Sequence, residues 1–153
     1  MSVSTPPSTL ADQVQWLVDR AAIGDLLIDF ARAPDDRDWE GYAANYAPEG
    51  TLAFNGHVAH EGREGLAAFV EAGLGQYAGT HHVSANHAIT VEGDVATSRS
   101  YLIAAHIFDA SDPTRHADGA GWYRCRLRRT DTGWRFTEVS VEIKYLSGEP
   151  IIH

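Results

Sequence analysis

Several features that mark particular classes of protein are scarce or missing in this sequence of 153 residues. Its single cysteine, Cys125, excludes a disulfide within the chain and fits a reducing compartment. Lys and Arg total 12 against 21 Asp and Glu, which gives a net charge of −9. Binding to nucleic acid or to an anionic membrane depends on basic surface, so neither is an expected partner.

Segments that direct a chain to or across a membrane are missing as well. No apolar run approaches the length of a transmembrane helix. Residues 1–9 lack the basic and apolar regions of a signal peptide, and we expect them to form a disordered tail. The sequence therefore predicts a cytoplasmic protein, with one domain over residues 10–147 and a C-terminal tail over residues 148–153.

Patterns that bind metals or phosphates are weak. His57 and His60 have the separation of a metal pair, but on a predicted strand this separation points the two rings to opposite faces. No cysteine cluster is present, so a zinc site is not expected. The glycines near residues 62–75 are scattered and resemble no phosphate-binding loop. We expect no metal and no cofactor.

Three helices are predicted in the first half of the domain. Apolar residues recur at helical spacing over residues 10–33, 39–46 and 63–77. The periodic set of the first helix consists of Val14, Leu17, Ala21, Ile23, Leu26, Leu27 and Phe30. Pro34 is expected to end or bend this helix, because the residue before a proline avoids the helical region. Asp38 is the expected N-cap of the second helix.

Strands dominate the rest of the sequence. A turn at residues 47–50 is expected to precede a short hairpin, residues 51–54 and 57–60, joined at Asn55-Gly56. Longer strands are predicted over residues 80–91, 95–108, 121–130 and 134–146. This order predicts an α+β fold in which three helices pack on the concave face of a strongly curved, mostly antiparallel sheet.

The last two strands also predict their own register. A three-residue turn over residues 131–133 places Arg126 opposite Glu138, a pairing typical of a solvated face. The other face, which we expect to be the inner one, pairs Tyr123, Cys125 and Leu127 with Val141, Val139 and Thr137.

The strand over residues 95–108 has apolar residues on both faces. Leu102, Ala104, His106 and Phe108 alternate with Tyr101, Ile103, Ala105 and Ile107. A strand that is apolar on both sides must bury its second face too, and the helices are expected on one side only. A second subunit is the expected cover, so the sequence predicts a homodimer or a higher homo-oligomer.

The candidate chemistry lies in the stretch from Gly79 to Asn86, which holds the adjacent histidines His81 and His82. Histidine titrates closest to neutral pH and is the usual side chain for moving a proton. Asp35 follows the first predicted helix, and His106 lies on the next strand. If the fold brings Asp35, His82 and His106 together, the carboxylate can orient an imidazole that acts as a general base.

Each candidate also has a structural interpretation. Asp35 can cap the second helix or lie in solvent beside Asp36. His82 shares strand parity with Ser84 and Asn86, a polar set that can face water unless curvature or a bulge turns it inward. His106 sits among apolar residues and can be a hydrogen-bonded core histidine.

Three short motifs resemble the SnoaL-like branch of the NTF2-like cone fold, which includes scytalone dehydratase-like lyases. They are Arg20-Ala-Ala-Ile-Gly-Asp-Leu26 in the first helix, Asp35-Asp-Arg-Asp-Trp39 after it, and Thr80-His-His-Val83 on a strand. The resemblance covers about residues 13–145 and implies the cone fold. It implies that Asp35 and His82 form a catalytic pair. The strand length from Ala96 to His106 implies that His106 is a second catalytic histidine.

The chain also departs from scytalone dehydratase. Pro34 and Phe54 stand where that enzyme has tyrosines that hold a water, and Tyr123 stands where it has an asparagine. Scytalone itself is therefore not the expected substrate.

Two functions remain open on the sequence. The first is a cofactor-independent lyase of the dehydratase type, or an isomerase, acting on a hydroxylated, cyclic, largely apolar substrate. The expected lining of its pocket is Trp39, Phe54, Phe69, Leu102 and Tyr123. The alternative is a module on the same fold that binds a small ligand or mediates assembly without catalysis.

Overall fold

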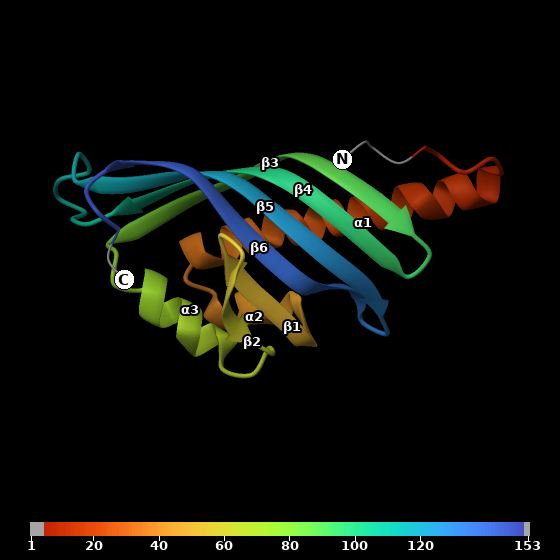
Figure 1. Ribbon diagram of the computed structural model, residues 1–153, viewed down its shortest axis with the longest axis horizontal. Helices are drawn as coiled ribbons and strands as arrows, with labels where there is room; N and C mark the ends of the chain where they lie inside the picture. The colour runs from red at the N-terminus through yellow and green to blue at the C-terminus, as the bar shows by residue number, and fades with distance from the viewer. Residues whose placement is uncertain (1–4, 152–153) are drawn as a thin grey trace.

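The computed structural model describes residues 5–151, so residues 1–4 and 152–153 of the two expected tails lie outside the described part (Figure 1). The helices are α1 (Leu10–Asp35), α2 (Trp39–Ala44) and α3 (Leu66–Leu74). The strands are β1 (Tyr46–Phe54), β2 (His57–Glu61), β3 (Gly79–Glu92), β4 (Val95–Ile107), β5 (His116–Thr130) and β6 (Gly133–Gly148). None of these helices combines the length and apolar character needed to cross a membrane.

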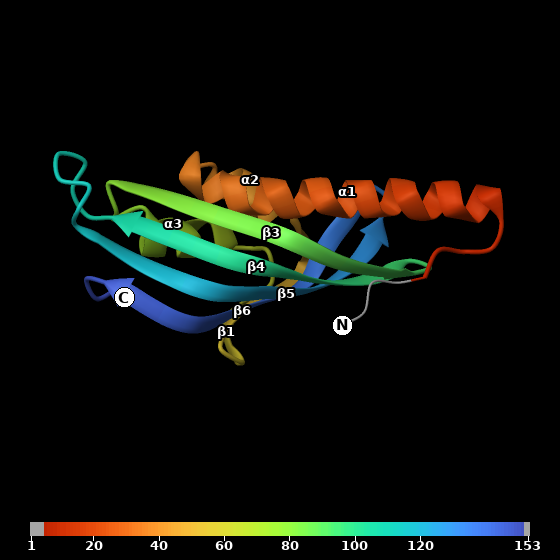
Figure 2. The same ribbon diagram turned by 90° about the horizontal axis from the view of Figure 1, so that it is seen from above.

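The strands form one sheet in the order β2-β1-β6-β5-β4-β3. Only β1 and β6 run parallel within this sheet, and the other neighbouring strands are antiparallel. The long strands bend and twist together, and α1 lies along one side of them beside β3 (Figures 1 and 2). The predicted α+β architecture, with helices packed on a mostly antiparallel sheet, is confirmed.

The first helix continues past Pro34 to Asp35, so the predicted end at Ala33 is wrong. Pro34 lies in the last turn, where few helical bonds remain to be broken. The helix closes there because the backbone N–H of Asp36 donates to the carbonyl of Arg32. Next along the chain, Arg37 has a left-handed φ of 57° and its guanidinium donates to the carbonyls of Gly75 and Tyr77. These contacts fix the end of α1 beside the start of β3.

The two halves of α1 have different environments. Ile23, Leu27 and Phe30 are buried in the core, whereas Val14 and Leu17 are 53% and 57% exposed. The first turns of the helix project beyond the end of the sheet (Figures 1 and 2). The sequence pattern therefore predicted the helix correctly, but its N-terminal apolar residues do not join the core.

The centre of the fold is filled by aromatic rings. Phe30 contacts Tyr42, Tyr123 and Phe136 at centroid distances of 4.9, 5.1 and 5.2 Å. Tyr46 is fully buried in the same cluster, but it begins β1 and does not belong to α2. The turn predicted at residues 47–50 is also wrong, because these residues belong to β1 and span a shift in its register against β6.

The last hairpin confirms most of the predicted register. Arg126 lies opposite Glu138, and the inner face pairs Tyr123 with Val141. Leu127, however, lies opposite Phe136 and not opposite Thr137, because the register shifts between Arg126 and Leu127. This shift directs the large Phe136 ring into the aromatic core.

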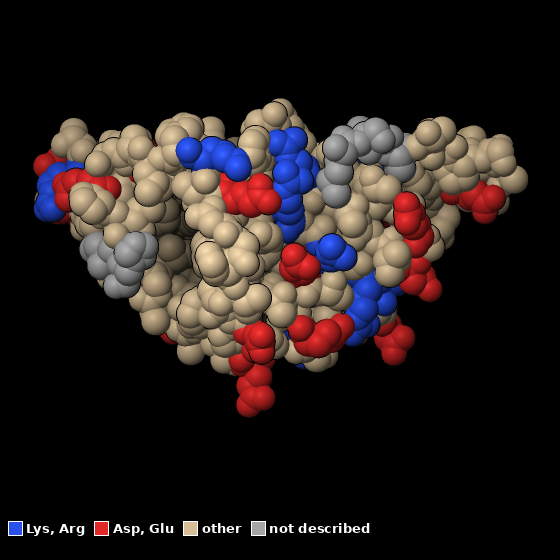
Figure 3. All heavy atoms as spheres, in the orientation of Figure 1, with Lys and Arg blue, Asp and Glu red and all other residues tan. Residues whose placement is uncertain are grey.

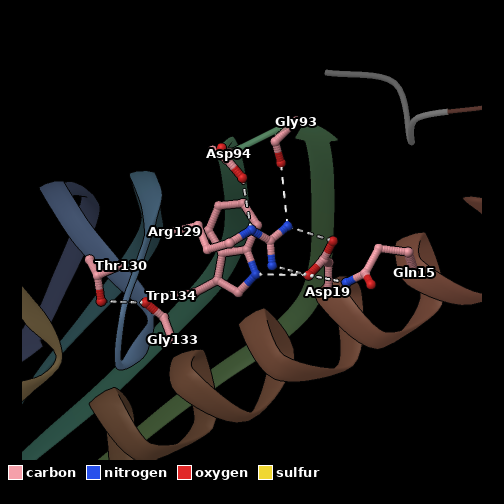
Figure 4. A network of polar contacts seen from close by, with 8 residues as sticks. All are labelled: Gln15, Asp19, Gly93, Asp94, Arg129, Thr130, Gly133 and Trp134. Carbon is pink, nitrogen blue, oxygen red and sulfur yellow. Dashed lines mark hydrogen bonds and ion pairs between the residues drawn. The ribbon is translucent and has the colours of Figure 1, made fainter.

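A buried carboxylate joins α1 to the far ends of the strands (Figure 4). The side chain of Asp19 is 5% exposed and accepts two hydrogen bonds from Arg129, at 2.7 and 2.9 Å. Trp134 Nε1 and Gln15 Nε2 also donate to it, at 3.1 and 3.2 Å. Arg129 reaches Asp94 in the β3–β4 turn at 2.9 Å. The network therefore connects three separate parts of the chain.

Candidate active site

Asp35 and His82 meet at the seam between α1 and β3. His82 Nδ1 lies 2.8 Å from Asp35 Oδ1, within the hydrogen-bond distance expected of a general base and its orienting carboxylate. The backbone N–H of His82 donates to Asp35 Oδ2 at 2.8 Å, and Thr80 Oγ1 donates to Oδ1 at 2.8 Å. Asp35 therefore orients the imidazole and also accepts a hydrogen bond from a backbone N–H of the edge strand β3.

A bulge in β3 places His82 on the inner face of the sheet. His82 lies opposite Ala104 and Thr80 lies opposite His106, and both of these β4 residues are buried. The register then shifts between Ala85 and Ala88, where Asn86 has a φ of 55°. The extra residue reverses the strand parity, so that Ile89 also points inward. The bulge thus lets one strand present polar side chains at one end of the core and apolar ones at the other.

The electrostatics of Asp35 favour the carboxylate form. Burial raises the pKa of Asp35, but the hydrogen bonds from the His82 ring, the His82 backbone and Thr80 together outweigh it and leave this pKa lowered. An ionised carboxylate accepts hydrogen bonds only, so Nδ1 of a neutral His82 carries the proton. Nε2 then holds the lone pair, which is the arrangement a general base requires.

His106 packs against the same ring. The two imidazoles are edge to face at a centroid distance of 5.6 Å, and His106 is 7% exposed. Its Nδ1 lies 3.1 Å from the carbonyl of Ala117, which can only accept, so Nδ1 carries the proton. Burial lowers the pKa of His106, and the hydrogen bond to the Ala117 carbonyl offsets this effect only in part, so a neutral ring is favoured. His106 is therefore a buried, hydrogen-bonded histidine that also lies beside His82, and its catalytic role stays a prediction.

A hollow opens beside the pair. Its volume is about 290 Å³, and its lining is Ile28, Ala31, Arg32, Asp35, His82, Val83 and Ser84. One wall is the last turns of α1 and the other is the first half of β3. The sequence interpretation missed Ile28, Ala31 and Arg32 as lining residues. These residues precede Asp35 by seven, four and three positions, a spacing that places them on the same side of the helix as Asp35. This spacing could have identified them from the sequence.

The other predicted lining residues lie elsewhere. Leu102 and Tyr123 are buried in the core, and Trp39 packs against that core. Phe54 and Phe69 are 44% and 40% exposed, and the Phe69 ring contacts His60 at 5.2 Å. None of the five lines the hollow at Asp35, so their contact with a substrate stays a prediction.

A second hollow of about 650 Å³ lies between α2, the start of β1 and the start of α3. Its lining includes Glu40, Pro48, Arg63 and Glu64, and none of the three candidate catalytic residues. Within residues 5–151, no group of three or more His, Cys, Asp or Glu side chains could hold a metal ion.

Comparison with known proteins places this chain in a family. The model of the SnoaL-like domain matches residues 15–140, which include Asp35, His82 and His106. An uncharacterised protein of Mycobacterium tuberculosis is 27% identical over 123 residues, which cover 80% of this chain and 83% of the relative.

Solved structures show the same fold. A provisionally assigned scytalone dehydratase from Novosphingobium aromaticivorans is 22% identical with a TM-score of 0.80, covering 91% of this chain and 93% of the other. A type 2 hexachlorocyclohexane dehydrochlorinase is 22% identical with a TM-score of 0.78, covering 92% and 95%. The expected NTF2-like fold is therefore confirmed, and the chain belongs to the SnoaL-like domain family.

Proposed function

We propose that this protein is a cofactor-independent lyase of the dehydratase type, or an isomerase, in which His82 is the general base. The observation that carries the proposal is the 2.8 Å contact between His82 Nδ1 and Asp35 Oδ1 at the wall of an open hollow. Two proteins of the same fold are described as a dehydratase and a dehydrochlorinase, which are both lyases.

The proposed step is removal of a proton from a carbon next to a carbonyl, or from a carbon next to the one that bears a leaving group. The Nε2 lone pair of His82 takes the proton, and the imidazolium that forms is paired with the Asp35 carboxylate. The electron pair of the broken C–H bond forms a carbon–carbon double bond. In the lyase reaction, formation of this double bond expels the leaving group. In the isomerase reaction, it moves the carbonyl electrons onto oxygen, and return of the proton to another carbon completes the isomerisation.

Two groups are proposed to assist the departing or developing oxygen. His106 contacts the His82 ring, but its neutral form holds a lone pair at Nε2 and donates there only after taking up a proton. Tyr123 keeps its proton, because burial raises its pKa, with Tyr42, Cys125 and Asp35 adding to the effect. Tyr123 is therefore a hydrogen-bond donor at neutral pH, but it does not line the hollow, whereas His106 contacts the His82 ring.

The proposed substrate is a neutral, hydroxylated ring compound of polyketide, terpenoid or steroid type. Ile28, Ala31 and Val83 supply apolar lining beside the acidic Asp35. The net charge of −9 also disfavours anionic substrates.

Solvent-deuterium exchange tests the base. Cyclic ketones incubated with the protein in D₂O are expected to gain deuterium at the carbon next to the carbonyl, as followed by NMR. Replacing His82 with alanine is expected to reduce this exchange about 10²–10⁴-fold, the usual contribution of general-base catalysis. Exchange that persists unchanged in His82→Ala would exclude His82 as the base. Tight binding of several apolar ligands without any exchange would support the non-catalytic binding module instead.

We also propose that the outer sheet face pairs two copies of the chain. Tyr101, Ile103 and Tyr145 share this face and are 49%, 53% and 59% exposed. Beside them the Trp122 ring is covered by Arg99 at 4.3 Å and Lys144 at 4.6 Å. Figure 3, which views the molecule with the sheet in front of α1, shows uncharged atoms over much of this side.

A charge introduced on this face is expected to separate the subunits. Light scattering at micromolar concentration should give a dimer for the wild type and a monomer for Ile103→Glu, because a buried unpaired carboxylate is costly. Val58→Glu is the matched control, since Val58 is 57% exposed on β2, away from the proposed interface. A wild type that is monomeric under these conditions contradicts the dimer.

A further inference from the structure

Ser84 joins two other polar side chains on the inner side of β3. Its hydroxyl donates to Ser100 Oγ at 2.9 Å, and His87 Nε2 lies 3.1 Å from the same hydroxyl oxygen. Ser100 is 2% exposed and comes from β4, while His87 is the second residue of the bulge. The Ser84 hydroxyl is thereby held from two sides.

The hydrogen-bond capacity of Ser84 is only partly used. His87 Nε2 also lies 3.2 Å from the backbone carbonyl of Ser84, which accepts only, so this nitrogen carries a proton and is the donor. The Ser84 hydroxyl therefore accepts from His87 and donates to Ser100. A hydroxyl oxygen has two acceptor positions, so one remains for a further donor.

The remaining position is available to a ligand of the proposed active site. Ser84 lines the same hollow as Asp35 and His82. It is two residues along the strand from His82 and on the same face, a separation of about 6.6 Å. Burial lowers the pKa of His87, an effect that its bond to the Ser84 carbonyl partly offsets, so the neutral form of the side chain that donates to Ser84 is favoured. A neutral hydrogen-bond donor therefore suits the free acceptor position of Ser84 better than an ion does.

We propose that Ser84, held by His87 and Ser100, is a specificity-determining residue that accepts a hydrogen bond from a substrate hydroxyl group. That hydroxyl would lie roughly 6.6 Å along the strand direction from the carbon that faces His82. The inference rests on the proposed function and narrows its substrates. They would carry a free hydroxyl on a part of the ring system distant from the reacting carbon.

A matched set of three ketones tests this inference. The probes are tetralone, a tetralone with a hydroxyl on the ring distant from the ketone, and the methyl ether of that hydroxyl compound. Titration calorimetry on the wild type is expected to show about three- to tenfold tighter binding of the hydroxyl compound than of tetralone, the usual gain from one hydrogen bond. The methyl ether has no proton to donate and should show no gain.

Ser84→Ala is expected to abolish this preference, so that the hydroxyl compound and tetralone bind equally tightly to the variant. Ser84→Thr keeps the hydroxyl in a residue suited to a strand and should retain the preference. Ser140→Ala, on the outer face of β6, is the matched control and should bind all three probes as the wild type does. Circular dichroism verifies that each variant is folded.

The outcomes separate this inference from the proposed function. A preference that survives in Ser84→Ala, or equal binding of the three ketones by the wild type, overturns the role of Ser84 even where deuterium exchange proceeds. A preference that depends on Ser84 supports the role even where His82→Ala leaves exchange unchanged. Failure of the wild type to bind any of the three ketones overturns the assigned substrate class together with the role of Ser84.

Discussion

Replacing Asp35 with asparagine is expected to slow proton abstraction by about 10²–10⁴-fold while the chain still folds. The amide can present only one acceptor oxygen, whereas the carboxylate accepts from Thr80, the His82 backbone and the His82 ring. An amide N–H facing His82 Nδ1 favours the other tautomer, which removes the lone pair from Nε2. An uncharged partner also no longer stabilises the imidazolium.

The neighbouring acid provides the control. Asp36 carries the same charge one residue later, but it is exposed and paired with Arg32 on the surface. Asp36→Asn should therefore keep the wild-type exchange rate. Unfolding is followed in urea alongside the kinetics, because loss of one hydrogen bond to Asp35 is expected to cost only about 1–3 kcal/mol. Asp35→Asn that unfolds at low temperature, or that exchanges at the wild-type rate, would instead assign Asp35 a structural role.

The pairing of Asp35 with His82 was predictable from two short motifs that resemble those of the SnoaL-like family. Asp35 is the last residue of a helix whose buried side contains Ile23, Leu27 and Phe30. His82 begins a long strand whose partner, β4, has a clear alternation. These patterns place each residue in its element, and the contact between the two residues was implied by the resemblance.

The bulge that turns His82 inward was not fixed by the sequence pattern. Strict alternation places His82 and Asn86 on one face of the strand and Ile89 on the other. In the structure, the bulge at Asn86, which has a left-handed φ, lets both His82 and Ile89 point inward. Asparagine tolerates this conformation better than most residues, so Asn86 was the one available signal. Its meaning depends on the pairing with β4, which is a tertiary property.

The pocket lining was the least predictable feature. The sequence identifies Phe54 and Phe69 as large apolar residues, but size does not decide which side of the sheet or helix a ring occupies. Phe30, Tyr42 and Phe136 fill the middle of the fold, which leaves the hollow at the seam of α1 and β3. Such competition for interior volume involves residues far apart in the sequence.

The largest effect on stability is expected at the buried carboxylate Asp19. Replacing Arg129 with methionine should lower the free energy of unfolding by about 3 kcal/mol, because it leaves a buried charge without its main partner. Trp134 and Gln15 still donate to Asp19, and the Arg129 side chain is 34% exposed, which places the effect at the lower end of the usual range.

A second arginine on the same strand is the matched control. Arg126 pairs with Glu138 at 3.3 Å, but its side chain is 73% exposed. Arg126→Met should therefore change the free energy of unfolding by no more than about 1 kcal/mol. Urea titrations at neutral pH compare the two variants with the wild type. Equal losses from Arg129→Met and Arg126→Met would contradict the special role of the buried network.

The pH dependence gives an independent test of the same network. The hydrogen bond from Arg129 is the main cause that lowers the pKa of Asp19, and it prevails over burial, which raises this pKa. A carboxyl whose pKa is lower in the folded state adds stability above its unfolded pKa of about 3.9, and this contribution is lost as the pH falls through the folded-state value. The wild type should therefore lose its advantage over Arg129→Met as the pH is lowered from 5 to about 2. An advantage that stays constant over this range would show that Arg129 stabilises the fold by packing on Trp134, where its guanidinium lies 4.6 Å from the ring centroid, and not through the charge of Asp19.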